Sequence, residues 1–321
     1  MGDPAGIGPE IVLRLLLPLL DAAADGGQIA TGARYVVYGD RGLLEREARR
    51  YGVDLGRLEI RACSSLPADL PVGRVDARAG DAAFRAVRQA AEDAMAGKVR
   101  AVVTAPLNKE AMNAAGFHYP GHTEILAEVA GGVPVRMMLA NQELRTVLVT
   151  IHQPLRQAID SLSQGLILET IRLTHRHLRR TGLGSPRIAV AGLNPHAGEG
   201  GLMGREEIEI ISPAIEAARQ EGIEASGPYP PDTVFMQARG FSRFDVVIAM
   251  YHDQGLIPVK YLGLEEGVNI TVGLPFVRTS PDHGTAFDIA GQGKADTRSL
   301  AAALRMADEM SRTPSDGPAF A

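Results

Sequence analysis

The stretch Thr146-Val147-Leu148-Val149-Thr150 is short and almost uninterrupted in apolar and β-branched side chains, and it leads directly into Ile151 and His152. A run of this kind is typical of a strand that is covered on both faces of its sheet. Four further runs of the same character occur, at residues 34–38, 101–104, 187–191 and 245–249. We therefore predict a sheet that carries helices on both sides.

Amphipathic stretches with helical spacing lie between these runs. They cover residues 81–96, 166–180, 206–221 and 298–312, and Pro9 suits the first turn of another helix that ends near Leu17. Alternating strands and helices predict an α/β fold with a largely parallel sheet. Ala140-Asn141-Gln142-Glu143 has the composition of a hairpin turn, which predicts one antiparallel pair. The tail at 313–321 is expected to fray.

Composition excludes several classes of protein. The 321 residues carry a net charge of −5, so the chain lacks the basic balance of a nucleic-acid-binding protein. The longest apolar stretch, residues 11–20, is interrupted by Arg14 and Pro18 and is too short to span a bilayer. Cys63 is the single cysteine, which excludes an intramolecular disulfide and a cysteine-built metal site. We expect a cytoplasmic protein with no nucleic-acid or membrane partner.

Three of the predicted strands lead into a histidine, and function in parallel α/β sheets collects at the carboxyl ends of strands. The histidines are His152, His196 and His252, after the runs at 146–150, 187–191 and 245–249. A single such histidine is more often a hydrogen-bonded loop residue, but three at equivalent positions favour a metal site. Three imidazoles suit Zn²⁺ or a similar divalent ion, and three protein ligands leave a position open for catalysis.

Two carboxylates lie near these histidines in the sequence. Asp253 follows His252 and would either hydrogen-bond a ligating ring or bind the metal itself. Asp232 is a second candidate, although a helix N-cap before Thr233 is an equally good interpretation.

Several polar stretches could bind an anion. The loop at residues 2–10 leads into a helix and has a composition that suits phosphate, as does the segment at 197–205, but neither contains a Rossmann or P-loop fingerprint. Arg278 lies in an uncharged run, which favours an anion clamp over a solvated surface residue. The other candidates are His122, Thr123, Lys260 and Asn269, and the sequence His283-Gly284-Thr285 is either a cofactor loop or a simple turn. Thr123 could alternatively cap a short helix.

Taken together, these motifs resemble one family, the 4-hydroxythreonine-4-phosphate dehydrogenases of pyridoxal 5′-phosphate synthesis and their paralogues. The matching stretches span nearly the whole chain: 1–10, 104–109 (TAPLNK), 119–124 (YPGHTE), 194–201 (NPHAGEGG), 231–235 (PDTVF), 250–255 (MYHDQG) and 267–290. The family has a short apolar strand before Gly2-Asp3-Pro4, whereas here Met1 begins that motif, so the resemblance predicts a sheet without its first strand.

The resemblance implies a fold of two α/β/α domains with a cleft, similar to isocitrate and isopropylmalate dehydrogenases. It implies one domain from residues 1–120 and 280–321 on the NAD side, and a second domain, 121–279, with the metal ligands and the contacts of a homodimer that shares its active site. His152, His196 and His252 become ligands of Zn²⁺, Mg²⁺, Co²⁺ or Mn²⁺. His122, Thr123, Lys260, Asn269 and Arg278 become substrate contacts, and residues 283–285 bind NAD or NADP.

The implied reaction is oxidation of a phosphorylated hydroxy acid by NAD⁺, followed by loss of CO₂. The base is not assigned; Lys260 is a candidate for proton transfer, and Asp253 is the other catalytic candidate. Residues 227–233 and 254–258 look more like the paralogues, which act on 4-phospho-threonate, 4-phospho-erythronate or a terephthalate cis-dihydrodiol. Without the resemblance, the three histidines alone favour a Zn²⁺ hydrolase. A phospho-ligand sensor is the alternative without catalysis.

Overall fold

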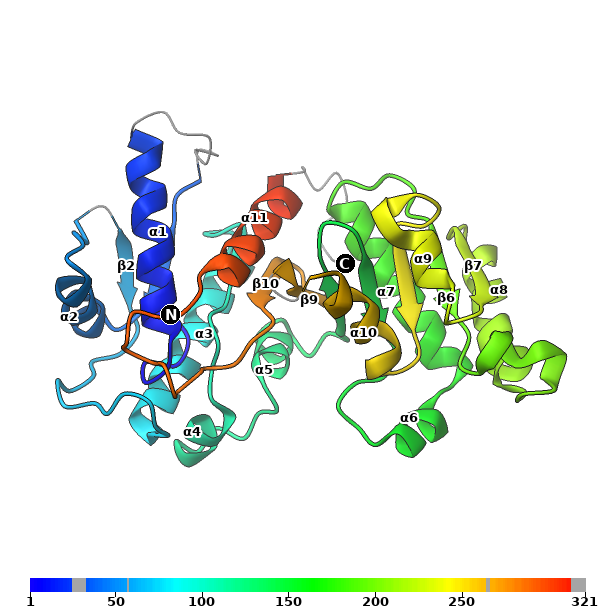
Figure 1. Ribbon diagram of the computed structural model, residues 1–321, viewed down its shortest axis with the longest axis horizontal. Coiled ribbons are helices and arrows are strands. Elements are labelled where there is room, and N and C mark those ends of the chain that lie inside the picture. Colours follow the sequence, from blue (N-terminus) through cyan, green and yellow to red (C-terminus); the bar gives the residue numbers. More distant parts are fainter. Residues whose placement is uncertain (25–32, 57, 264–265, 313–321) are drawn as a thin grey trace. The chain divides into compact units, whose positions relative to one another are not determined.

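The computed structural model describes residues 1–24, 33–56, 58–263 and 266–312. The chain forms two compact units (Figure 1). Unit 1 consists of Met1–Val133 and Leu274–Asp308, and unit 2 consists of Pro134–Gly273 with the end of the last helix from Glu309. The tail for which fraying is predicted, 313–321, lies outside the described residues.

Unit 1 contains two pairs of parallel strands, β1 with β2 and β3 with β10. Helix α3 packs against both β1 and β3. The elements are α1 (Gly8–Ala24), β1 (Val36–Gly39), α2 (Arg41–Tyr51), β2 (Glu59–Ala62), α3 (Ala77–Met95), β3 (Ala101–Val103), α4 (Lys109–Ala114), α5 (His122–Val129), β10 (Val277–Pro281) and most of α11 (Arg298–Arg312).

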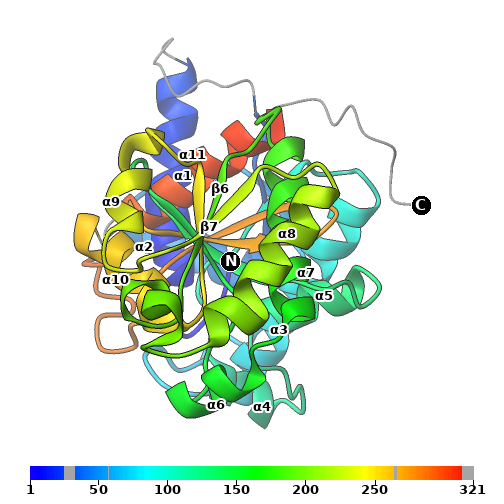
Figure 2. The same ribbon diagram turned by 90° about the vertical axis from the view of Figure 1, so that its right-hand side faces the viewer.

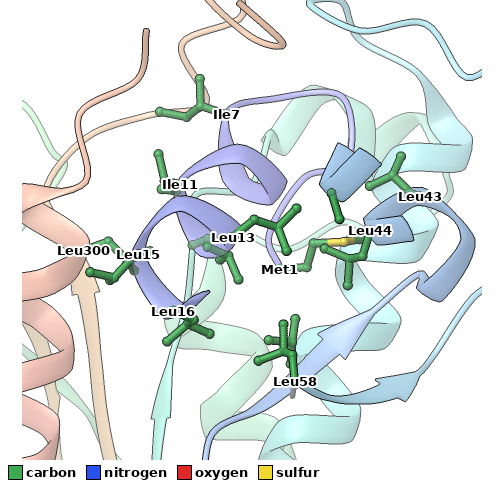
Figure 3. Close-up of a cluster of buried hydrophobic side chains, with 14 of the residues drawn as sticks. Met1, Ile7, Ile11, Leu13, Leu15, Leu16, Leu43, Leu44, Leu58 and Leu300 are labelled. Atoms are coloured by element: carbon green, nitrogen blue, oxygen red, sulfur yellow. The ribbon is translucent and has the colours of Figure 1, made fainter. Parts of the chain in front are cut away.

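Helix α1 is longer than the sequence predicts, because it continues past Pro18 to Ala24. A proline inside a helix removes one hydrogen bond, to the carbonyl four residues earlier, and normally ends or kinks the helix. Here the turns before the proline are held by packing, since the apolar side chains of α1 are buried against α2, β2 and α11 (Figure 3). The labelled residues of this cluster include Ile11, Leu15, Leu44 and Leu300.

Unit 2 is built around neighbouring strands in the order β9-β4-β5-β8-β6-β7. Strands β5, β8, β6 and β7 are parallel, and β4 runs antiparallel to both β5 and β9. The elements are β4 (Arg136–Ala140), β5 (Arg145–Leu148), α6 (Leu155–Ser161), α7 (Gln164–Arg180), β6 (Ile188–Ala191), η1 (Pro195–Gly201), η2 (Glu207–Ile211), α8 (Ser212–Gln220), β7 (Ala225–Tyr229), α9 (Val234–Ala238), η3 (Arg239–Phe241), β8 (Val246–Ala249), α10 (His252–Leu262) and β9 (Val268–Val272).

Helices cover both faces of this sheet, as the buried strands predict. Figure 2 shows α7 and α8 on one side of the strands and α9 and α10 on the other. All four residues of β6 and of β8 are buried. The α/β fold, the five predicted strands and the hairpin are therefore confirmed. In the hairpin, Asn141 Oδ1 accepts hydrogen bonds from the backbone N–H groups of Glu143 and Leu144, both at 2.8 Å.

The helix predicted over residues 206–221 is only partly correct. It starts with a wider π-turn, η2, and becomes an α-helix only at Ser212. π-Turns are rare and are often found at functional sites. Along the described part of the chain, no helix combines the length and the apolar character that crossing a membrane requires.

Candidate active site

The three histidines predicted to bind a metal follow three adjacent strands of unit 2. Strand β8 lies between β5 and β6 and is parallel to both, so the carboxyl ends of all three meet at one edge of the sheet. His152 follows β5, His252 follows β8, and His196 follows β6. The rings of His152 and His252 are neighbours, with centroids 5.6 Å apart. The sheet therefore brings the loops of the predicted ligands to a common edge.

Buried hydrogen bonds tie these strand ends together. Thr150 donates its hydroxyl to the carbonyl of Met250 at 2.7 Å, which links the end of β5 to the end of β8. Gln254 links β8 to β6, because its Oε1 accepts from Met250 N and its Nε2 donates to Gly192 O, both at 2.7 Å. Sequence reasoning missed Gln254, since nothing local distinguishes a bridging glutamine from a solvated one.

The imidazole of His252 is oriented by its neighbour in the chain. Its Nδ1 lies 2.7 Å from Oδ1 of Asp253, as the sequence analysis proposed for a ligating ring. Pairing of one ring nitrogen with a carboxylate fixes the tautomer and leaves Nε2 to bind a ligand. His252 is 39% exposed and Asp253 is 74% exposed, so both groups face solvent.

His196 lies in an unusual backbone turn. Five consecutive residues from His196 to Gly200 have positive φ angles between 44° and 82°, and His196, Ala197 and Glu199 are not glycines. A left-handed conformation costs an L-residue roughly 1–2 kcal/mol. Such strain persists only where the surrounding structure enforces it, and it is concentrated at functional sites. His152 also has a positive φ, of 42°.

The described residues do not contain three or more His, Cys, Asp or Glu side chains gathered closely enough to hold a metal ion. Two of the three predicted ligands, His152 and His252, are neighbours, and His196 is exposed in the loop after the adjoining strand. The donor types and strand positions fit a divalent ion, with His196 as the ligand that would complete the set. The triad therefore stays a prediction.

Unit 1 contains a buried cation close to a neutral histidine. Arg278, on β10, is 3% exposed, and its Nη2 donates to Thr104 Oγ1 at 2.7 Å. Burial lowers the pKa of Arg278 to about 10, so the guanidinium stays charged at neutral pH. Burial, and then the charge of Arg278, lower the pKa of His122 well below its usual range. Nε2 of His122 is buried without a hydrogen-bond partner. These groups suit an anion at the start of α5.

The structure corrects two sequence predictions nearby. Thr123 is not the cap of α5: Gly121 occupies that position, and His122 and Thr123 form the first turn. The loop at residues 2–10 is not an open phosphate cradle, because it is buried and its amides donate internally. Asp3 N donates to Pro106 O at 2.8 Å, and Ile7 N donates to Thr285 O at 3.0 Å.

The remaining predicted residues are dispersed. Lys260 is exposed in the last turn of α10, and Asn269 is partly buried on β9, opposite Leu139 of β4. His283 is exposed, with Nδ1 3.1 Å from Gly284 O. Asp232 is exposed and does not cap α9, whose N-cap is Thr233. Unit 1 thus holds His122, Thr123, Arg278 and residues 283–285, and unit 2 holds the three predicted metal ligands, Asp253, Lys260 and Asn269.

Comparison with known proteins identifies relatives along the whole chain. A family described as "Pyridoxal phosphate biosynthetic protein PdxA" matches residues 31–307. A 4-hydroxythreonine-4-phosphate dehydrogenase of Beijerinckia indica is 54% identical over 97% of this chain and 93% of its own length. A D-threonate 4-phosphate dehydrogenase of Salmonella typhimurium is 46% identical over 97% of both chains. The crystal structure of a 4-hydroxythreonine-4-phosphate dehydrogenase from Klebsiella pneumoniae superposes with a TM-score of 0.86 at 45% identity, covering 97% of this chain and 98% of that one.

Proposed function

Because the chain belongs to the family of the pyridoxal phosphate biosynthetic protein PdxA, we propose that it converts 4-hydroxy-L-threonine 4-phosphate to 3-amino-2-oxopropyl phosphate. It is a dehydrogenase, as its relatives are named, and we propose that it uses a nicotinamide cofactor. The observation that carries the proposal is the set of three histidines after three adjacent parallel strands. The substrate alcohol gives a hydride to NAD⁺ or NADP⁺ and a proton to a base, and the resulting β-keto acid loses CO₂.

His152, His196 and His252 would hold one divalent ion, which when bound supplies Lewis-acid polarisation of the substrate hydroxyl. Asp253 fixes the ring of His252 through the 2.7 Å contact to Nδ1. Lys260, exposed on the same helix α10, is the candidate for proton transfer. Zn²⁺, Mg²⁺, Co²⁺ and Mn²⁺ all accept imidazole or oxygen ligands, so the donor types do not select one of them. Titration of the protein with each ion identifies the one that binds most tightly.

Arg278 and His122 are proposed to bind the phosphate or carboxylate of the substrate. A buried guanidinium is a strong anion ligand because its charge is poorly screened and it donates in a fixed fork. The buried Nε2 of His122 lacks a partner, so it is available to form a hydrogen bond with a polar group of the substrate. Thr123 and Asn269 are further proposed substrate contacts, and residues 283–285 are proposed to bind the nicotinamide cofactor.

We further propose a cytoplasmic homodimer with a shared active site. Unit 2 exposes several large apolar side chains, and a protein interface is marked where such side chains form a contiguous patch. They include Leu202 at 78% exposure, Met236 at 74%, Ile257 at 63% and Tyr261 at 90%. Light scattering after size-exclusion chromatography tests the dimer, and the substitution Tyr261→Ser is expected to weaken it.

The test of the function is the production of NADH or NADPH by the full chain with each divalent metal in turn. 4-Hydroxythreonine 4-phosphate, 4-phospho-D-threonate, 4-phospho-D-erythronate and a terephthalate cis-dihydrodiol are compared at equal concentration. Preference for 4-phospho-D-threonate would establish the second candidate function, which is favoured by relatives of that name at 45–48% identity. Release of phosphate without a cofactor would indicate a hydrolase, and binding without turnover would indicate a sensor.

A further inference from the structure

We propose that Glu207 is a positioning residue that shapes the loop of His196 for metal binding. The proposal rests on the proposed function, in which His196 is one of three metal ligands. Glu207 lies in the π-turn η2 and is 2% exposed, which is unusual for a carboxylate without an ion-pair partner among the described contacts. A buried carboxylate is retained in a folded protein only where several donors satisfy it.

The donors to Glu207 come from the chain that precedes His196. Oε1 accepts from Leu193 N at 2.8 Å and from Asn194 N at 2.7 Å. Oε2 accepts from Asn194 Nδ2 at 3.0 Å, and the same amide also donates to Glu206 Oε2 at 2.7 Å. The carboxylate therefore fixes the backbone of Leu193 and Asn194, the two residues directly before Pro195.

The glycines of the loop make room for this carboxylate. A Cβ added at Gly198 would lie 2.6 Å from Glu207 Oε2, closer than non-bonded atoms can approach. A Cβ at Gly192 would lie 3.1 Å from Oε1. Gly198 also has a φ of +82°, in the left-handed run. The loop thus folds around Glu207 on both sides of His196.

The other two histidine loops are anchored by hydrogen bonds at the equivalent position. Asn194, Thr150 and Met250 each precede their histidine by two residues, and each takes part in a buried or partly buried hydrogen bond that is not part of a strand ladder. Hydrogen-bonded groups around ligating residues commonly set metal affinity, and their loss typically weakens it by about 10–100-fold. Glu207 supplies this support for His196.

The test measures Co²⁺ binding to the full chain by calorimetry and by the visible absorption of the bound ion. The variants are Glu207→Ala, Glu207→Gln and, as a matched control, Glu209→Gln. Glu209 lies two residues along, and its carboxylate pairs with Arg205 at the surface. His196→Ala is the reference for loss of the ligand. In Glu207→Gln, the new amide nitrogen would face Asn194 Nδ2, so two donors would oppose each other. Rotating the Asn194 amide by 180° would relieve this contact, but it would place Asn194 Oδ1 against the carboxylate of Glu206. We expect Glu207→Ala to weaken Co²⁺ binding by about 10–100-fold, with a smaller loss in Glu207→Gln and none in Glu209→Gln.

Hydrogen exchange gives a second measurement that does not depend on the metal. The amides of Leu193 and Asn194 are expected to exchange faster in both Glu207 variants and unchanged in Glu209→Gln. Co²⁺ affinity equal to that of the unmodified chain in both folded Glu207 variants, with weaker binding in His196→Ala, would overturn the positioning role and leave the proposed metal site standing. Undiminished binding in His196→Ala would overturn the ligand role itself, and the positioning role with it.

Discussion

The substitution Gln254→Ala tests whether the ends of β6 and β8 are held together by one side chain. Gln254 is 8% exposed, and its two hydrogen bonds, to Met250 N and to Gly192 O, are both 2.7 Å long. Truncation leaves one buried donor and one buried acceptor without a partner. Each such group costs about 1–3 kcal/mol, so we expect the free energy of unfolding to fall by about 2–6 kcal/mol.

The assay is urea denaturation followed by circular dichroism, with Gln220→Ala as the control because Gln220 is an exposed glutamine at the end of α8. Gln254→Glu separates the two bonds, since it keeps an acceptor for Met250 N and places a carboxylate oxygen against Gly192 O. We expect Gln254→Glu to be destabilised as well. A free energy of unfolding for Gln254→Ala within about 0.5 kcal/mol of the unmodified chain, the usual range of neutral surface changes, would refute the bridging role.

Three further predictions concern buried charged or titratable groups. Asp93→Ala is expected to lower the free energy of unfolding by about 2–3 kcal/mol, because the buried carboxylate accepts from Tyr38 Oη at 2.7 Å and from Lys98 Nζ at 3.0 Å. His177 is 3% exposed, and burial lowers its pKa from 6.5 to about 3, so the unfolded chain binds the extra proton between these values. Stability should therefore fall as the pH falls through that window, by up to about 1.4 kcal/mol per pH unit, and His177→Leu should flatten the dependence. Arg278→Lys should raise the KM for the phosphorylated substrate about 10–100-fold, since a buried hydrogen-bonding fork is replaced by a point charge.

The predictions for Asp93 and His177 each have a control residue of the same type that is less buried. Asp81→Ala removes a carboxylate that pairs with Arg85 at the surface of the same helix α3. His118→Leu changes an exposed histidine and should leave the dependence of stability on pH as it was. If the free energy of unfolding of His177→Leu still fell as steeply between pH 6.5 and 3, the argument for His177 would be wrong. If the folded Arg278→Lys variant kept the KM of the unmodified chain, the argument for Arg278 would be wrong.

Strands β6 and β8, inside the sheet of unit 2, are among those that could be predicted. Strand β8 is buried along its whole length, and its sequence contains only apolar residues, so one local pattern is sufficient. Strand β7, Ala225–Tyr229, was not predicted because it contains Gly227 and Pro228 and lies at the end of the strand order. Proline and glycine are tolerated at sheet edges, where fewer ladder bonds are needed, and there the apolar signal disappears.

The candidate site likewise contains some residues that could be identified from the sequence and others that could not. The three histidines could be identified because each directly follows a recognisable strand, and parallel pairing of β5, β8 and β6 then brings their loops to one edge. The residues that shape those loops could not be identified. Glu207 lies in a stretch with helical amphipathic spacing, where a glutamate is normally solvated, and its contacts depend on a π-turn that the pattern does not encode. Gln254 depends likewise on Gly192, 62 residues away in the chain.

The polar contacts explain why strand packing alone is insufficient for this site. Apolar packing of β5, β8 and β6 fixes where each strand ends, but it leaves the following loop free to choose among backbone conformations. At all three loops, the residue two positions before the histidine is fixed by a directional hydrogen bond, to Met250 O, to Gln254 Oε1 or to Glu207 Oε1. Directional bonds select one loop geometry where apolar contacts tolerate several, and each bond is strongest in a buried, low-dielectric environment. Metal geometry at this edge is therefore expected to be more sensitive to Glu207 and Gln254 than to any single apolar residue of the strands.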